Sequence, residues 1–324
     1  MSRWHVIGGT TFDLLAHDLP TLPRTDAAGD EFTLASLVRL PAPFVCSVGG
    51  NAGNAAFVAA RLGCRARLVT GFADDIFGGW LRERFTDAGV ELVRVRPSET
   101  SINVVATDAR GRRTSLFRPV HLDVADLCAA ARPVRFSPGD VVLVAGYPHP
   151  EVAAILPWVQ PAAASGALVA LDVGPVAARL TAAALAEALP ALDLVFANHL
   201  ELEALVPGLE PLAAARRIAE QHDLAVVAKA GAAGVTYVTA DSQVAAPAFP
   251  VNATGPTVGA GDAFNAGFLT ASVQGVEPLE ALQFGAAVAA LVVQRSQGVL
   301  GAPTRDAVAQ LLATHAPPPP RSGP

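Results

Sequence analysis

From about residue 141 onward, short apolar runs alternate with longer segments rich in alanine and leucine. Each apolar run ends in glycine, proline or asparagine, and the segments between have the length of helices, as in PLAAARRIAEQH at 211–222. Strands that are apolar on both faces and alternate with helices are typical of a parallel sheet covered on both sides. We expect four strands of such a sheet within residues 141–148, 167–175, 192–198 and 225–231.

The N-terminal part of the chain continues this pattern. WHVIGG (4–9) and RARLVTGFADD (65–75) predict two further strands, and GNAAFVAARLG (53–63) predicts a helix between them. The sequence therefore predicts an α/β fold whose central, mostly parallel sheet is flanked by helices on both faces. Ligands of such sheets collect beyond the carboxyl ends of the strands. We expect the Gly, Asn and Asp residues that close these runs to lie at the functional edge.

Two segments instead alternate apolar with polar residues, a pattern typical of strands with one face in solvent. They are DEFTLASLVRL at 30–40 and the segment 99–118, which carries a turn at DARGRR. Both predict antiparallel strands. We expect them to form a small antiparallel β-sheet that projects over the ligand edge as a lid.

A length of 324 residues suits one large α/β domain or two smaller ones. Because the alternating segments interrupt the main pattern early, we interpret them as insertions at about 12–40 and 95–120. Residues 1–316, with these insertions included, then form a single domain. The proline-rich tail at 317–324 is predicted to be extended and disordered.

The composition narrows the possible partners. Hydrophobic residues make up 52% of the chain and charged residues 16%, as expected for a well-filled core. A net charge of −6 and a pI near 5.6 offer no basic surface for nucleic acid, and no basic amphipathic or long apolar stretch indicates a membrane. The cysteines Cys46, Cys64 and Cys128 are expected to be reduced thiols. With no signal segment recognisable, the sequence predicts a cytoplasmic protein.

The segment GPTVGAGDAFNAG (255–267) places Gly259, Ala260 and Gly261 directly before an acid, Asp262. Small residues let the backbone approach a ligand closely, and the free N–H groups at a helix start form an anion site. Phosphoryl transfer needs such donors, together with a carboxylate that takes the proton of the attacking hydroxyl. An acidic cap after a flexible loop explains the same segment.

Two strand ends carry residues suited to a nucleotide. In NHLE, Asn198 and Glu201 stand three apart and could hold water around Mg²⁺, although a capping box explains the same pair. In KAGAAG, Lys229, Gly231 and Gly234 belong to a turn whose backbone could meet nucleotide phosphates or ribose. An ordinary turn is the alternative there.

Two N-terminal segments offer groups for substrate hydroxyls. GGNAGNAA (49–56) lies just ahead of a helix and can present amides to a polyol, and Asp13, after GGTTF, is a carboxylate at a strand end. An ordinary helix start is the alternative for the first segment. A purely structural acid is the alternative for Asp13.

The order of these segments makes the chain resemble the ribokinase-like (PfkB) carbohydrate kinase family over roughly residues 4–314. The matching features are Asp13, GGNAGN, a β-hairpin, NHLE, KAGAAG and, most specifically, GAGDAFNAGF. The resemblance implies transfer of the γ-phosphoryl group of ATP, with Mg²⁺, to a hydroxyl of a sugar, a nucleoside or a similar molecule. It also implies a lid that in many members forms a homodimer interface.

The resemblance assigns roles by position. The residues implied to catalyse are Asp262, as the base, and Gly259, Ala260 and Gly261, whose amides form the anion hole. Those implied to bind the nucleotide are Asn198, Glu201, Lys229, Gly231 and Gly234, with Glu201 holding Mg²⁺ through water. Those implied to bind substrate hydroxyls are Asp13, Gly50 and Asn54.

The chain departs from the family's pattern in three places. The family usually has D-T-x-G-A-G-D, where the first Asp commonly helps to hold a monovalent cation. Pro256 stands there, which puts activation by K⁺ in doubt. Asn51 and Ala52 occupy the GGKGAN turn, where ribokinases tend to have lysine, and Tyr147 stands where they tend to have a carboxylate. Both changes argue against ribose itself. The Tyr147 ring could stack on a sugar or base, or simply pack.

A phosphorylated substrate would need cations, and Arg112, Arg113 and Arg118 lie on the predicted hairpin. Such a turn is usually a solvated tip, so we favour a neutral substrate. The leading hypothesis is an ATP-dependent kinase for a sugar or related polyol, with a nucleoside kinase as the alternative. A non-catalytic regulator that binds sugar or nucleotide is a weaker hypothesis. A Rossmann dehydrogenase is excluded, because GGTTFD does not supply G-x-G-x-x-G.

Overall fold

The computed structural model describes residues 3–19, 22, 40–108, 112–122, 124–131, 134–146, 155–174, 188–251 and 257–315. Within these ranges, no helix has the length and apolar composition needed to cross a membrane. Four features singled out from the sequence lie outside the described residues. They are residues 30–39 of the strand expected at 30–40, Tyr147, Pro256 and the 317–324 tail.

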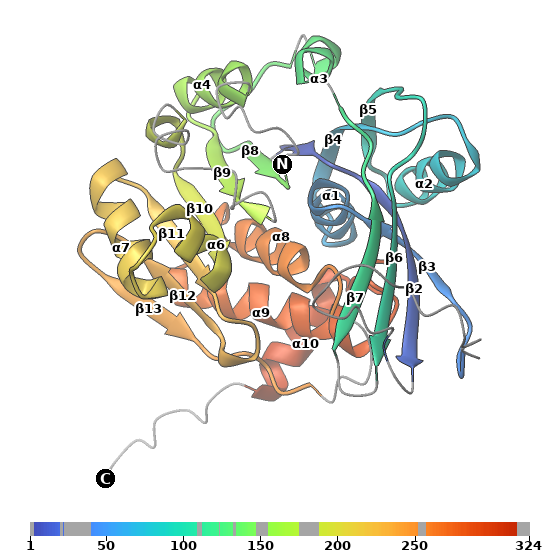
Figure 1. Ribbon diagram of the computed structural model, residues 1–324. Helices are drawn as coiled ribbons and strands as arrows, with labels where there is room; N and C mark the ends of the chain where they lie inside the picture. The colour runs from blue at the N-terminus through green and yellow to red at the C-terminus, as the bar shows by residue number, and fades with distance from the viewer. Residues whose placement is uncertain are drawn as a thin grey trace.

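The larger of two sheets has nine strands in the order β13-β12-β11-β10-β9-β8-β1-β4-β5 (Figure 1). The strands from β11 to β5 are parallel to their neighbours, whereas β12 and β13 pair antiparallel at one edge. The expected mostly parallel sheet is confirmed. The strand bounds are β1 Arg3–Gly8, β4 Arg65–Gly71, β5 Glu91–Val95, β8 Val141–Ala145, β9 Leu168–Asp172, β10 Leu194–Asn198, β11 Ala225–Lys229, β12 Val235–Val238 and β13 Gln243–Ala246.

Helices cover both faces of this sheet, because successive side chains of a strand point to opposite faces and each face is apolar. In β8, Val141 and Leu143 join one core, and Val142 and Val144 join the other. Helices contributing to the first core are α1 (Asn51–Arg61), α2 (Ile76–Asp87), α8 (Ala260–Ser272), α9 (Pro278–Gln294) and α10 (Arg305–His315). Those contributing to the second are α3 (Val124–Ala131), α4 (Leu156–Ala164), α6 (His199–Leu205) and α7 (Pro211–His222).

The smaller sheet has the order β3-β2-β6-β7 and is the predicted lid (Figure 1). Its strands are β2 (Thr11–Leu19), β3 (Val45–Gly49), β6 (Ile102–Asp108) and β7 (Arg113–Arg118). The outer pairs, β2–β3 and β6–β7, are antiparallel as expected, whereas the middle pair, β2–β6, is parallel. Because β2 and β6 come from separate excursions of the chain, no hairpin turn imposes an antiparallel pairing on them.

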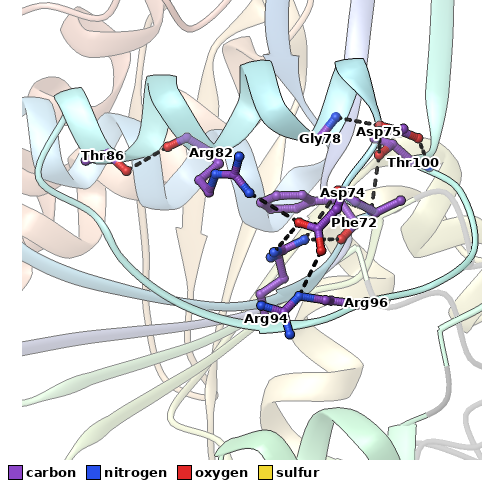
Figure 2. Close-up of polar contacts among 10 residues, drawn as sticks. Phe72, Asp74, Asp75, Gly78, Arg82, Thr86, Arg94, Arg96 and Thr100 are labelled. Carbon is purple, nitrogen blue, oxygen red and sulfur yellow. Dashed lines mark hydrogen bonds and ion pairs between the residues drawn. The ribbon is translucent and has the colours of Figure 1, made fainter.

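The junction between β4 and α2 fixes the start of the lid hairpin (Figure 2). Asp75 caps α2, its Oδ1 accepting from the Gly78 N–H at 2.7 Å. The same carboxylate accepts from the Thr100 hydroxyl at 2.7 Å and from the Thr100 N–H at 2.9 Å. Thr100 lies two residues before the hairpin strand β6, so one carboxylate connects the helix, the end of the main-sheet strand and the lid. Beside it at the surface, Asp74 pairs with Arg82, Arg94 and Arg96.

Candidate active site

Helix α8 starts at the predicted loop of small residues. Gly259 is its N-cap with a φ of 79°, and a Cβ on Gly259 would lie 2.6 Å from Val299 Cγ1. Backbone conformation and space therefore both require glycine at this position. The Ala260 N–H donates over 3.3 Å to Thr257 O, a long bond that leaves this amide weakly engaged. The predicted cradle of amides is thus a helix start with positive dipole character.

Asp262 lies in the first turn of α8 and is 9% exposed. Its Oδ2 accepts a hydrogen bond of 2.7 Å from the Asn54 side-chain amide of α1. Burial and the nearby carboxylate of Asp172 raise the pKa of Asp262 to about 7, against the opposing effects of Asn54 and Lys229. A carboxyl group with this pKa is matched to accepting a proton near neutral pH.

Asp13 lies in lid strand β2 and is 2% exposed. Its Oδ1 accepts from the Thr11 hydroxyl at 2.5 Å, and the Asn103 side chain of β6 donates to it as well. Burial raises the pKa of Asp13 to about 6, although both hydrogen bonds lower it. Gly49 of β3 leaves the space for this carboxylate, since a Cβ on Gly49 would lie 2.0 Å from Asp13 Oδ1.

The turn before α1 places the other two predicted substrate residues. Gly50 is the N-cap of α1 with a φ of 76°, and a Cβ there would lie 2.5 Å from Gly9 O. Glycine is therefore required at position 50 by the fold itself. Asn54 is buried, and its Oδ1 has no hydrogen-bond partner within the described part of the chain. Since a buried polar atom is normally satisfied, this oxygen is suited to accept from a bound hydroxyl.

Lys229, the last residue of β11, forms the charged centre of the site. Its Nζ lies 2.9 Å from Asp172 Oδ1 at the end of β9 and 3.3 Å from Asn265 Oδ1 on α8. Asp172 Oδ2 also accepts from the Asn51 amide at 3.1 Å. Burial lowers the pKa of Lys229, but the carboxylates of Asp172 and Glu201 raise it by more than burial lowers it. The net shift of the pKa is therefore upward.

Asp172 and Asn265 were not singled out from the sequence. Asp172 closes the apolar run at 167–175, and the general expectation that such closing residues lie at the functional edge includes it. Asn265 lies within GAGDAFNAGF, one helical turn after Asp262. Asp172 and Asn265 contact Lys229 only because of the order of the strands in the sheet and the orientation of α8.

Asn198 and Glu201 form a complete capping box at the start of α6. Asn198 Oδ1 accepts from the Glu201 N–H at 3.0 Å, and the Glu201 carboxylate accepts from the backbone N–H and side-chain amide of Asn198 at 2.8 and 2.7 Å. Burial raises the pKa of Glu201, with Lys229 acting in the opposite direction. NHLE therefore forms the capping box that was one of its two interpretations. In this arrangement Glu201 is buried just after the carboxyl end of β10.

Within the described ranges, no group of three or more His, Cys, Asp or Glu side chains is arranged to hold a metal ion. Both oxygens of the Glu201 carboxylate are engaged by Asn198. This donor set fits a hydrated Mg²⁺ carried by a nucleotide, because Mg²⁺ keeps several waters and needs few protein ligands. It does not fit a metal held by a protein cage.

A cavity of about 840 Å³ opens beside the first turn of α8. Gly231, the first residue of the 3₁₀ turn Gly231–Ala233, and Gly234, directly after that turn, line the cavity together with Lys229, Ala260 and Gly261. Most of its remaining wall is apolar, including Phe249 and Phe264. The predicted nucleotide turn and anion hole thus share one cavity that is large enough for a nucleotide.

The three arginines singled out on the lid hairpin are exposed, and two of them pair with acids. Arg112 pairs with Asp108, and Arg118 pairs with Glu99. Arg113, at the start of β7, is also exposed. These pairs agree with the expectation of a solvated hairpin.

Known proteins resemble the chain over most of its length. The chain is 32% identical over 271 residues to the ATP-dependent ribose-1-phosphate kinase of Halopiger xanaduensis, covering 82% of this chain and 87% of that protein. It is 26% identical over 298 residues to the nucleoside kinase of Methanothermobacter thermautotrophicus, covering 89% and 88%. The fold matches Arabidopsis thaliana ribokinase complexed with ribose and ATP with a TM-score of 0.73 at 23% identity, over 96% of this chain and 99% of that one.

The family comparison covers most of the site. The model of the pfkB family carbohydrate kinases matches residues 26–305, a range that includes Asn54, Lys229 and Asp262. These kinases are phosphotransferases, and the expectation of a kinase drawn from the sequence is confirmed. The chain belongs to the pfkB family of carbohydrate kinases.

Proposed function

We propose that this protein transfers the γ-phosphoryl group of ATP to a hydroxyl of a neutral sugar or related polyol. One observation carries the proposal. Asp262 is buried at the start of α8 beside the 840 Å³ cavity, and it is joined to Asn54 by a 2.7 Å hydrogen bond. A carboxylate and a helix start at one point are the parts that phosphoryl transfer requires.

In the proposed step, the substrate hydroxyl oxygen attacks the γ-phosphorus of ATP. The new oxygen–phosphorus bond forms as the bond to the bridging oxygen breaks, and the electron pair of that bond stays on the β-phosphate of ADP. Asp262 takes the hydroxyl proton. Asn54 holds Asp262 Oδ2, so Oδ1 is the proton acceptor. The amides of Gly259, Ala260 and Gly261 bind the charge on the phosphoryl oxygens.

Nucleotide binding is assigned to the cavity beside α8. Its apolar wall suits the base, and the turn with Gly231 and Gly234 lets the backbone approach the phosphates or ribose. Asn198 and Glu201 would orient water around Mg²⁺ bound to the nucleotide. When bound, Mg²⁺ neutralises charge on the β- and γ-phosphates.

Substrate binding is assigned to Asp13, Asn54 and the Gly49–Gly50 turn. The Asp13 carboxylate and the unpartnered Asn54 Oδ1 are hydrogen-bond acceptors, which suits the hydroxyls of a polyol. A nucleoside is the second candidate, because a nucleoside kinase matches 89% of this chain. The ribose of a nucleoside also carries hydroxyls that these acceptors would bind.

We further propose one cytoplasmic domain spanning residues 1–316 and a homodimer formed through the lid. Strand β7 is an edge of the lid sheet, and its Leu116 and Phe117 are each 56% exposed. An exposed apolar edge strand is suited to pairing with another copy. Light scattering on a size-exclusion column tests the dimer, and a monomeric mass at all concentrations would contradict it.

An ADP-release screen tests the proposed activity. Neutral sugars, nucleosides and ribose-1-phosphate are each offered with ATP and Mg²⁺, with and without K⁺. We expect turnover with a neutral sugar or polyol, and the same rate in both salts because Pro256 replaces the usual cation ligand. Turnover with ribose-1-phosphate alone would contradict the neutral substrate. No turnover with any hydroxyl compound would contradict the kinase activity.

A further inference from the structure

Lys229 is the only lysine in the chain, so every other residue among the 23 lysines and arginines is an arginine. This single lysine is at the active site and not on the surface. A lysine ammonium is a compact point charge with three donors, whereas arginine is a wide planar fork. A chain that otherwise uses arginine therefore has its one compact cation where phosphoryl transfer is proposed.

The ammonium of Lys229 is held in a defined place. Asp172 Oδ1 lies 2.9 Å from its Nζ, Asn265 Oδ1 lies 3.3 Å away, and the Phe196 ring centre lies 5.8 Å away. Asn51 donates to the second oxygen of Asp172 at 3.1 Å and so fixes that carboxylate. The ion pair is largely buried, since the Asp172 side chain is 1% exposed and the Lys229 side chain is 16% exposed.

This place adjoins both the anion hole and the nucleotide cavity. A Cβ built on Gly261 would lie 3.8 Å from Lys229 Nζ, and Lys229 lines the cavity together with Gly261 and Ala260. The ammonium therefore stands where the terminal phosphates of a nucleotide in this cavity would meet the first turn of α8. Side chains from β9, β11 and α8 converge there, and only one of them is a cation.

We propose that Lys229 is a catalytic residue whose ammonium contacts the phosphoryl group during transfer, and that Asp172 and Asn265 are positioning residues that hold the ammonium beside the amides of α8. The inference rests on the proposed function and assigns Lys229 more than nucleotide binding. Lys229 transfers no proton. It offsets the negative charge that the phosphoryl oxygens and the departing β-phosphate oxygen carry as the bond to ADP breaks.

The single lysine allows a direct spectroscopic test. Protein labelled with isotopes only in lysine gives one set of side-chain resonances, all from Lys229. We expect these resonances to shift when aluminium fluoride, a mimic of the transferring phosphoryl group, is added to the complex with ADP and Mg²⁺. Side-chain resonances identical in the ADP complex with and without the bound mimic would overturn the inference.

Kinetics of a charge-neutral double variant provide the second test. Lys229→Met alone leaves the Asp172 carboxylate buried without its cation, which endangers folding. Lys229→Met combined with Asp172→Asn removes both charges and keeps the net charge of the site. We expect kcat to fall by about 10²–10³-fold, with ADP binding retained in calorimetry. A kcat within about 3-fold of wild type would overturn the inference.

Arg216→Met is the matched control, because Arg216 of α7 is a partly buried cation bonded to Ala240 O and Gln243 outside the site. We expect its kcat to equal that of wild type. Absence of turnover in the wild-type protein itself would contradict the proposed function only. The resonance measurement would still decide whether Lys229 contacts the phosphoryl mimic.

Discussion

The Asn54 side-chain amide donates to the Asp262 carboxylate over 2.7 Å, although the two residues are 208 positions apart in the sequence. Asn54 lies on α1 beside the lid, and Asp262 lies on α8 beside the proposed nucleotide cavity. The bond therefore joins the proposed substrate side of the site to the phosphoryl side. It also engages Oδ2 of the carboxylate, which leaves Oδ1 as the proposed proton acceptor.

Gly259→Ala should damage both stability and activity. Alanine at a φ of 79° is strained by about 1–2 kcal/mol, and its Cβ would lie 2.6 Å from Val299 Cγ1. The start of α8 must shift, and its amides move with it. Gly275→Ala is the control, because Gly275 has a φ of 76° with nothing within 4 Å of its Cβ. For Gly275→Ala, thermal melts should show only the loss of stability caused by the strained backbone, and kcat should stay at the wild-type value. Equal kcat values for the two variants would contradict the anion hole.

The pH dependence of kcat/KM should report the proposed base. Burial raises the pKa of Asp262 to about 7, and only the ionised carboxylate accepts a proton. Activity is therefore full above this pKa and falls as the pH drops through 7. Burial also raises the pKa of Asp13, to about 6, so the fall should steepen below pH 6 if the ionised form binds substrate. A flat kcat/KM from about pH 5 to 8 would argue against Asp262 as the base.

Glu201→Gln should raise the Mg²⁺ concentration needed for the half-maximal rate. The substitution keeps the size of the side chain but removes the charge that would orient water around the ion. Glu203→Gln on the same helix is the control, because Glu203 is exposed. The measurement is a Mg²⁺ titration at saturating ATP. The same half-maximal concentration in wild type and Glu201→Gln would leave Glu201 with its capping role only.

Asp75→Ala should destabilise the protein by about 1–2 kcal/mol, the usual cost of losing an N-cap. It removes three hydrogen bonds, to Gly78 and Thr100, that fix α2 to the start of the lid hairpin (Figure 2). Asp74→Ala removes the ion pairs with Arg82, Arg94 and Arg96, in which the Asp74 carboxylate is 52% exposed, and pairs of such an exposed carboxylate contribute little. Chemical denaturation of both variants is the measurement, and a larger loss for Asp74→Ala would contradict this assignment.

The main sheet could be predicted from the sequence because its strands are apolar on both faces and end in turn residues. The helix expected at 211–222 has the bounds Pro211–His222, since proline suits its first turn and its apolar residues repeat with helical spacing. The lid was harder to predict. Strands β2 and β6 pair in parallel although they lie in separate segments of the chain. The local pattern of apolar and polar residues does not indicate which distant strands pair, or in which direction.

The site could be predicted only in part for the same reason. Asp262 and Glu201 belong to short segments with a recognisable order of residues. Asp172 and Asn265 contact Lys229 because β9 lies two strands from β11 and one turn of α8 faces them. Neither residue stands out in the sequence. The NHLE segment was compatible with two interpretations, and the capping box in the structure does not exclude the second one.

The central claim is that Asp262 removes the proton of the attacking hydroxyl, and Asp262→Asn tests it most directly. The substitution keeps the side-chain size and an oxygen that can accept from Asn54. Asp306→Asn is the control, an exposed acid in the first turn of α10. With the substrate identified by the ADP-release screen, we expect kcat of Asp262→Asn to fall by about 10²–10⁴-fold while calorimetry finds ATP still bound. A kcat close to that of Asp306→Asn would contradict the account.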